Sequence, residues 1–134
     1  MPHLTIDYTA NLEATASMDM LCTTLAATLV ALRHDDGTPL FPVIGTRVMA
    51  RPAPHFAVAD GQPDRSFLYL NLLITPGRSP AMVQRVGEAV LACVKAHLAP
   101  VFGAHAVGLT LQVYEGAPVY EGKHNNLADR LAAA

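Results

Sequence analysis

The apolar residues of this chain follow one pattern twice, and that repeat limits the folds the chain can adopt. Alternating and helically spaced apolar residues predict strand, helix and strand in the first half and again in the second. The expected elements are strand 3–8, helix 18–32, strand 43–49, strand 67–74, helix 80–98 and strand 109–114. Matching elements lie about 65 residues apart, which indicates an internal duplication of form. The sequence therefore predicts two β-α-β halves, residues 1–50 and 66–116.

The first half is defined by its periodicity and by its turn residues. Leu4, Ile6 and Tyr8 alternate with polar residues, as in a half-buried strand. Apolar residues at helical spacing then predict a helix that ends near Arg33. Residues that suit its N-cap are Asn11, Thr15 and Ser17. Turn-forming residues at 34–39 separate this helix from the second expected strand.

The second half follows a segment rich in residues that break helices and strands. Pro52, Pro54, Gly61 and Pro63 fall within 51–65, which is therefore expected to link the two halves. The strand after it is apolar enough to be covered on both faces. Its helix is expected to begin with Ser79 as the N-cap and Pro80 at the first helical position, and to stop at Pro100. Residues 117–134 are expected to form a C-terminal tail.

These elements predict the α+β class, with one domain over residues 1–134. Two right-handed β-α-β crossovers can pair their strands in one four-stranded mixed sheet with both helices on a single face. The other face of the sheet then needs a partner, since 51% of the residues are apolar and only 15% are charged. Closing three such sheets into a ring would cover those faces. We therefore expect a homotrimer.

Charge and composition argue against several classes of function. The net charge is −2 and there is no basic run, which argues against nucleic-acid binding. No apolar stretch is expected to reach the roughly 20 residues of a membrane span, and the N-terminus lacks the pattern of a signal peptide. We therefore expect a cytoplasmic protein without membrane association. In that reducing compartment Cys22 and Cys93 are expected to fill the core rather than to form a bridge.

Metal and covalent chemistry are not suggested by any motif. The histidines show no ligand spacing such as a pair four residues apart on a helix. The serines have no glycine-flanked nucleophile elbow, and no glycine-rich loop suggests phosphate binding. We therefore expect neither a metal nor a cofactor.

Pro2 is a candidate general base because it follows the initiator methionine and precedes an expected strand. A proline nitrogen within a chain is an amide without basicity, whereas at a free terminus it is a secondary amine that accepts a proton. Removal of Met1 would expose that amine on a rigid element. Burial and neighbouring cations would lower its pKa toward neutral pH, as a general base requires. The alternative is that Met-Pro is an ordinary start to a chain.

Short motifs in a fixed order extend over nearly the whole chain. They are Pro2-His3-Leu4-Thr5-Ile6, Ile44-Gly45-Thr46-Arg47, Ala59-Asp60-Gly61-Gln62, Gly77-Arg78-Ser79 and Lys123-His124-Asn125-Asn126. Their order and spacing resemble the 5-carboxymethyl-2-hydroxymuconate isomerase family of the tautomerase superfamily. The resemblance implies a trimer of double β-α-β subunits with a catalytic N-terminal proline and no metal or cofactor.

Position by position, the resemblance places the catalytic base at Pro2 and two carboxylate-handling arginines at Arg47 and Arg78. Guanidinium groups match carboxylates with two parallel hydrogen bonds, which suits a di- or tricarboxylate substrate. Both cations would lower the pKa of the proline and stabilise charge in the transition state. The expected reaction converts 5-carboxymethyl-2-hydroxymuconate to its 2-oxo tautomer in aromatic-acid catabolism, as in homoprotocatechuate degradation.

Two departures from the family pattern leave the substrate open. The loop at 34–41 is longer than expected, and Gly45-Thr46-Arg47 stands where the family has Gly-Ile-Arg. One alternative is a tautomerase for another enol, such as the enol of phenylpyruvate. Another is a non-catalytic trimeric binding or scaffold protein, favoured if Met1 is retained. Arg51 and Arg65 are expected to face solvent, and the segment 124–126 is expected to order the tail against a neighbouring subunit.

Overall fold

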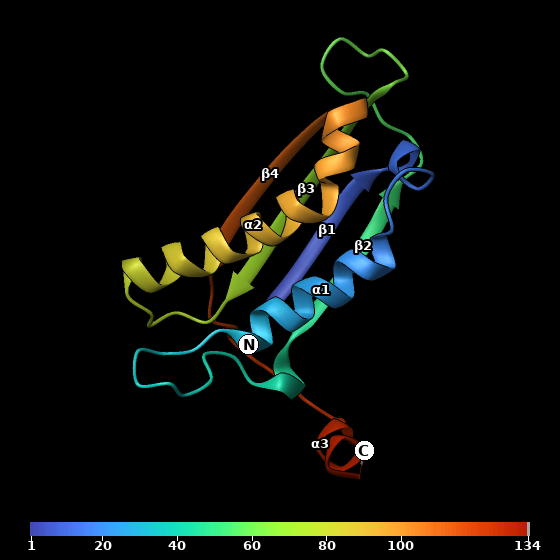
Figure 1. Ribbon diagram of the computed structural model, residues 1–134. Helices are drawn as coiled ribbons and strands as arrows, with labels where there is room; N and C mark the ends of the chain where they lie inside the picture. The colour runs from blue at the N-terminus through green and yellow to red at the C-terminus, as the bar shows by residue number, and fades with distance from the viewer. Residues whose placement is uncertain (134) are drawn as a thin grey trace.

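The computed structural model describes residues 1–133 and shows a four-stranded sheet with helices α1 and α2 packed on one face (Figure 1). The elements in chain order are β1 (His3–Thr9), η1 (Ala10–Leu12), α1 (Met18–Ala31), η2 (Val43–Gly45), β2 (Arg47–Ala53), β3 (Arg65–Ile74), α2 (Pro80–Ala104), β4 (Ala106–Glu115) and α3 (Leu127–Ala133). The strand order is β2-β1-β3-β4. The predicted α+β fold, with its mixed sheet and its two helices on one face, is confirmed.

The pairing of the strands reflects the two halves of the sequence. β1 runs parallel to β2, β3 runs parallel to β4, and the central pair, β1 and β3, is antiparallel. His3 is paired with Arg47 on one side and with Leu73 on the other. The beginnings of β1 and β2 therefore lie at the same edge as the ends of β3 and β4. The N-terminus, Arg47 and the loop after β3 meet at this edge.

Local capping explains where both long helices begin. The Ser17 hydroxyl accepts a hydrogen bond from the backbone N–H of Met20 at 3.4 Å, so Ser17 is the cap among the three candidates. The Ser79 hydroxyl accepts from the N–H of Met82 at 3.2 Å, and Pro80 occupies the first turn, as predicted. Asn11 does not cap α1; its amide instead donates to the Arg65 carbonyl at 2.7 Å and so fixes the end of the linker.

Three boundaries differ from the predictions. Residues 43–45 form a turn of 3-10 helix, and the second strand begins only at Arg47 and continues to Ala53, into the expected linker. This strand accommodates Pro52 because β2 is an edge strand, where a missing N–H is tolerated. Helix α2 continues through Pro100 to Ala104, and its last turn buries Val101 in the core.

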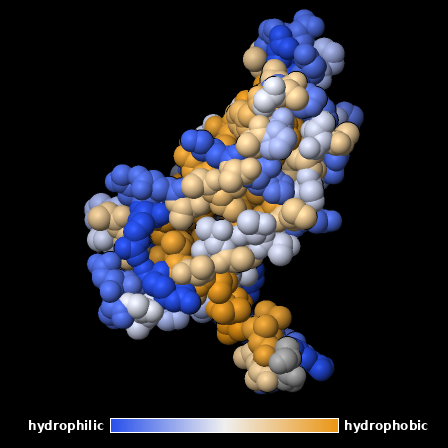
Figure 2. Space-filling model, in the orientation of Figure 1, coloured by the Kyte–Doolittle hydropathy of each residue, from blue (hydrophilic) through white to orange (hydrophobic). Residues whose placement is uncertain are grey.

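The tail also differs from the prediction. It contains a short helix, α3, that the sequence analysis did not predict, and its final residue, 134, lies outside the described residues. The tail extends away from the sheet and presents exposed apolar side chains, including Leu127 and Leu131 (Figures 1 and 2). The linker at the opposite end of the molecule is mainly hydrophilic (Figure 2).

The core lies between the two helices and the sheet. Val86, Val90, Val94 and Leu98 recur at helical spacing along α2 and are fully buried. From α1 and the strands, the fully buried side chains include Leu21, Leu25, Leu29, Ile6, Leu68, Leu70 and Leu72. Cys22 and Cys93 are free thiols and only partly buried, and Cys93 packs against this core.

Helix α2 corrects one expectation about membranes. Its 25 residues are long and apolar enough to cross a membrane by length and composition alone, although the sequence analysis expected no such stretch. The core helices of globular domains also pass this test. Val86, Val90, Val94 and Val101 of α2 are buried in the core, which accounts for part of the apolar character of the helix.

The second face of the sheet is not covered by any described element. It carries Met49, Leu73 and Tyr114, which are 57%, 45% and 49% exposed. Polar side chains lie between them, and Arg51 of this face forms an ion pair with Asp7 at 3.3 Å. This face is therefore mixed in character, whereas the sequence analysis expected it to be apolar.

Candidate active site

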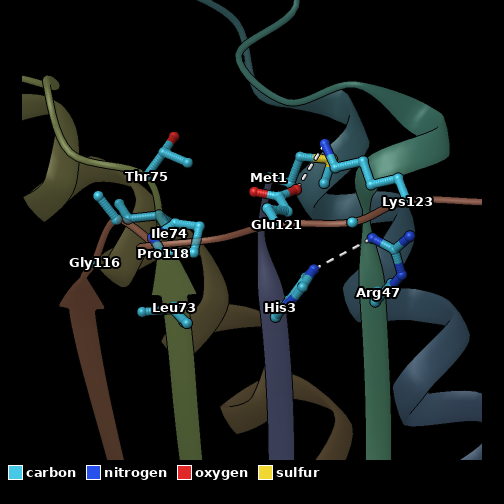
Figure 3. Close-up of a pocket in the computed structure, with 12 residues that line it drawn as sticks. Met1, His3, Arg47, Leu73, Ile74, Thr75, Gly116, Pro118, Glu121 and Lys123 are labelled. Carbon is cyan, nitrogen blue, oxygen red and sulfur yellow. Dashed lines mark hydrogen bonds and ion pairs between the residues drawn. The ribbon is translucent and has the colours of Figure 1, made fainter.

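A cavity of about 640 Å³ lies at the sheet edge where the N-terminus meets the start of β2 (Figure 3). It is lined by Met1, His3, Arg47, Leu73, Ile74, Thr75, Gly116, Ala117, Pro118, Glu121, Gly122 and Lys123. Four parts of the chain therefore form it: the first residues, the beginning of β2, the end of β3, and the segment after β4. Two of the three predicted site positions, Pro2 and Arg47, are found at this edge.

Pro2 is buried between Met1 and β1, and its carbonyl accepts a hydrogen bond from the backbone N–H of Arg47 at 3.1 Å. This bond fixes the N-terminus against β2. The Met1 side chain lies against Gly45, where a Cβ atom would come within 2.6 Å of the Met1 sulfur. Met1 lines the cavity and Pro2 lies directly behind it in the chain, so removal of Met1 would both free the proline nitrogen and open the cavity toward it.

Arg47 is half-buried and held by two acceptors. One Nη atom lies 3.2 Å from Nε2 of His3 and 3.2 Å from the Gly45 carbonyl oxygen. A guanidinium group can only donate, so Nε2 of His3 accepts this hydrogen bond. Burial, and next the Arg47 cation, lower the pKa of His3, which favours this neutral form. His3 therefore orients Arg47 at the cavity, a role the sequence analysis did not assign.

The surroundings of the terminal amine favour its uncharged form. Burial is the largest cause that lowers the pKa of the Met1 amine, followed by the cations of Arg78 and Lys123. Arg47 acts in the same direction, whereas Glu121 raises the pKa. A terminal amine at this position therefore has a pKa below its ordinary value, as a base that works near neutral pH requires.

Arg78 occupies a different position from Arg47. It lines a neighbouring cavity of about 590 Å³, beside the loop that follows α1. One Nη donates to the Thr75 carbonyl at 2.8 Å, the other donates to the Leu40 carbonyl at 3.4 Å, and the guanidinium lies 4.8 Å from the centre of the Phe41 ring. Arg78 therefore acts on the amine electrostatically from the next loop. Thr75 connects Arg78 to the main cavity, because it lines that cavity and accepts the hydrogen bond from Arg78.

Glu121 and Lys123 are cavity residues that the sequence analysis did not select. Their side chains form an ion pair of 2.8 Å, and Nζ of Lys123 lies 3.6 Å from the Met1 sulfur. More than a hundred residues separate the tail from the N-terminus, so no local pattern could reveal this contact. The only signal in the sequence was the motif that begins at Lys123.

The remaining candidate residues lie elsewhere. Arg51 is 68% exposed and paired with Asp7, as expected for a solvent-facing residue. Arg65 is less exposed than expected, because its side chain forms ion pairs with Asp60 at 2.9 Å and Asp64 at 2.6 Å. Within residues 1–133, no cluster of three or more His, Cys, Asp or Glu side chains is arranged to bind a metal.

Comparison with known proteins gives one consistent result. Residues 2–131 match the family model of 5-carboxymethyl-2-hydroxymuconate isomerase. The 5-carboxymethyl-2-hydroxymuconate Delta-isomerase of Escherichia coli is 28% identical over 127 residues, which cover 95% of this chain and 96% of that protein.

Solved structures agree with the sequence comparison. The crystal structure of a 5-carboxymethyl-2-hydroxymuconate delta-isomerase superposes with a TM-score of 0.92 at 42% identity and covers 98% of this chain and 93% of the other. A 5-carboxymethyl-2-hydroxymuconate isomerase from Deinococcus radiodurans R1 gives a TM-score of 0.81 at 32% identity, with coverage of 97% and 93%. More distant tautomerase-superfamily structures share the fold alone. The chain has the double β-α-β fold, with its N-terminus at a cation-lined cavity. These matches show that the chain belongs to the 5-carboxymethyl-2-hydroxymuconate isomerase family.

Proposed function

We propose that this protein converts 5-carboxymethyl-2-hydroxymuconate to its 2-oxo tautomer and that Pro2, freed by removal of Met1, is the general base. The observation that carries the proposal is the meeting of the N-terminus and Arg47 in one cavity, within a chain of this isomerase family. Burial and nearby cations lower the pKa of the Met1 amine, one residue before Pro2. The reaction would serve the breakdown of aromatic acids.

The proposed reaction moves one proton and requires no oxidant or reductant. The Pro2 amine takes the proton from the 2-hydroxyl group of the dienol, and the electron pair left on that oxygen forms the 2-oxo group. The conjugated double bonds shift, and the protonated amine returns the proton to a carbon of the chain. One group can therefore act first as the base and then as the acid.

The two arginines have distinct proposed roles. Arg47 faces the cavity and is held in place by His3 and Gly45, so it is prepared to bind a substrate carboxylate through paired hydrogen bonds. Arg78 lies one loop away, with its guanidinium engaged by carbonyl oxygens. It would lower the pKa of the base and stabilise negative charge on the dienolate.

Steady-state assays across a range of pH test the proposed function. The Met1-free protein should ketonise 5-carboxymethyl-2-hydroxymuconate, and kcat/KM should rise with pH as the amine loses its proton. Burial, Arg78 and Lys123 lower the pKa of the Met1 amine, and the same surroundings should act on the Pro2 amine after Met1 is removed. The rise should therefore occur below pH ~8, the ordinary value for a terminal amine. Absence of turnover, or a rise only above that pH, would contradict the proposal.

A non-catalytic binding protein is the second candidate, and retention of Met1 in cells would favour it. Met1 fills part of the cavity and holds the Pro2 nitrogen in an amide, so a protein that keeps Met1 has no base. Intact-mass measurement of protein isolated from cells decides between the two. A mass without Met1 supports the isomerase, whereas a mass with Met1 supports the binding protein.

We also propose that the protein works as a homotrimer. The uncovered face of the sheet exposes Met49, Leu73 and Tyr114, and three such sheets could cover one another in a ring. Sedimentation equilibrium should give three times the chain mass of 14.2 kDa. Replacing Leu73 by aspartate should shift the protein toward smaller species, while Met20→Asp, on the exposed side of α1, should not. A monomeric wild-type protein would refute the trimer.

A further inference from the structure

The tail that follows β4 brings an ion pair to the mouth of the candidate active site. It extends across the ends of the central strands, and the side chains of Glu121 and Lys123 meet above Met1 (Figure 3). Lys123 reaches from the far end of the chain to within 3.6 Å of the Met1 sulfur. Both residues line the same cavity as Arg47. This pair is therefore part of the wall of the cavity.

Lys123 has few strong partners in this position. An ammonium group offers three donors, and here one meets the Glu121 carboxylate at 2.8 Å while another faces a thioether, which is a weak acceptor. Removal of Met1 would leave the Glu121 carboxylate as its one partner among residues 1–133. The lysine can therefore accept a new anionic partner with little loss.

Arg78 lines the neighbouring cavity, whereas Lys123 lines the main one. Its Nη atoms already donate to the Thr75 and Leu40 carbonyl oxygens, and its guanidinium lies over the Phe41 ring. Within the main cavity the cationic side chains are Arg47 and Lys123, and Glu121 is the carboxylate beside them. A substrate with several carboxylates needs more than one cation, and Lys123 supplies the second.

We infer that Lys123 is a further substrate-binding residue that binds a carboxylate of the substrate, and that Glu121 occupies its ammonium group until that carboxylate displaces it. The inference rests on the proposed function in taking a polycarboxylate as the ligand. It assigns opposite effects to the two partners of one ion pair. Lys123 attracts the ligand, whereas Glu121 competes with it for the same cation.

Calorimetric titration with tricarballylate tests the inference without turnover, because this tricarboxylate has no enol to isomerise. Lys123→Gln should bind tricarballylate about tenfold more weakly than the Met1-free wild-type protein, a change of about 1.4 kcal/mol. Glu121→Gln should bind it more tightly, by about threefold. Lys123→Arg should restore most of the affinity. Lys95→Gln removes the only other lysine, which is exposed on α2, and should change nothing.

The signs of these effects separate a binding role from a structural one. If the ion pair only held the tail in place, Lys123→Gln and Glu121→Gln would weaken binding together, and that result would overturn the inference. Equal affinity of Lys123→Gln and wild type, or no binding by the wild type, would also overturn it. Kinetics at a pH high enough to keep the amine uncharged in both proteins give a second readout, since Lys123→Gln should there raise KM about tenfold and leave kcat within about twofold.

The same measurements distinguish this inference from the proposed function. A protein that binds tricarballylate through Lys123 but does not ketonise the dienol would refute the isomerase and leave the carboxylate site standing. A protein that turns over the dienol with no contribution from Lys123 would refute the inference and leave the isomerase standing.

Discussion

Replacing Pro2 by alanine should lower kcat/KM for the dienol by at least about 100-fold, the lower end of what a general base contributes. Alanine after Met1 still yields a terminal amine, but a primary one without the ring that fixes its direction. Pro2 is buried, and its carbonyl is fixed by the Arg47 N–H at 3.1 Å, so the ring holds the nitrogen at the cavity. Losing that orientation misplaces the base relative to the hydroxyl proton.

The change in ultraviolet absorbance as the dienol is consumed measures this effect. Intact masses must show that Met1 has been removed from both the variant and the wild-type protein. Pro118→Ala is the matched control, because Pro118 lines the same cavity and its nitrogen remains an amide. This control should retain kcat/KM within a few-fold. Full activity in Pro2→Ala would rule out the proline as the base.

Replacing Arg47 by glutamine should lower kcat/KM for the polycarboxylate about 100-fold, equivalent to about 2.7 kcal/mol. Arg47 is half-buried, and His3 and the Gly45 carbonyl already orient its guanidinium group. The guanidinium group can therefore donate two parallel hydrogen bonds to a substrate carboxylate. Glutamine keeps a donor but loses the charge and the second parallel hydrogen bond. The loss should be much smaller for the enol of phenylpyruvate, which has a single carboxylate.

Arg51→Gln is the control for this prediction. Arg51 lies on the same strand and the same face of the sheet, but it is paired with Asp7 and 68% exposed. It should change kcat/KM little for either substrate. The comparison is made with steady-state kinetics on both enols and with thermal unfolding of each variant. Equal losses on the two substrates would show that Arg47 supports the fold or the base and does not select the polycarboxylate.

The element pattern could be predicted because its signals are local. In β1 every second residue is apolar, and in α2 the apolar residues recur at helical spacing. Each pattern spans only a few residues and indicates which face of its element is buried. Ser79 followed by Pro80 fixes the start of α2 within one turn. The expected strand 43–49 contained Arg47, whereas the observed strand begins at Arg47, four residues later.

The errors have non-local causes. Pro52 is compatible with β2 only because this strand is at the edge of the sheet, and Pro100 is compatible with α2 because the turn around it is anchored by buried Val101. A proline disfavours both a strand and a helix interior when only its neighbours in sequence are considered. Strand order and packing make these two positions compatible with proline, and neither can be read from the local sequence.

Spacing and short motifs predicted the two β-α-β halves, the start of α2 and the resemblance to the family, while three N-cap candidates stayed open for α1. Three features became visible only in the folded chain: His3 orients Arg47, Arg78 is engaged one loop away, and Lys123 reaches the N-terminus. These contacts join residues far apart in the chain. Their formation depends on strand register and on the path of the tail, and no local periodicity encodes either of them.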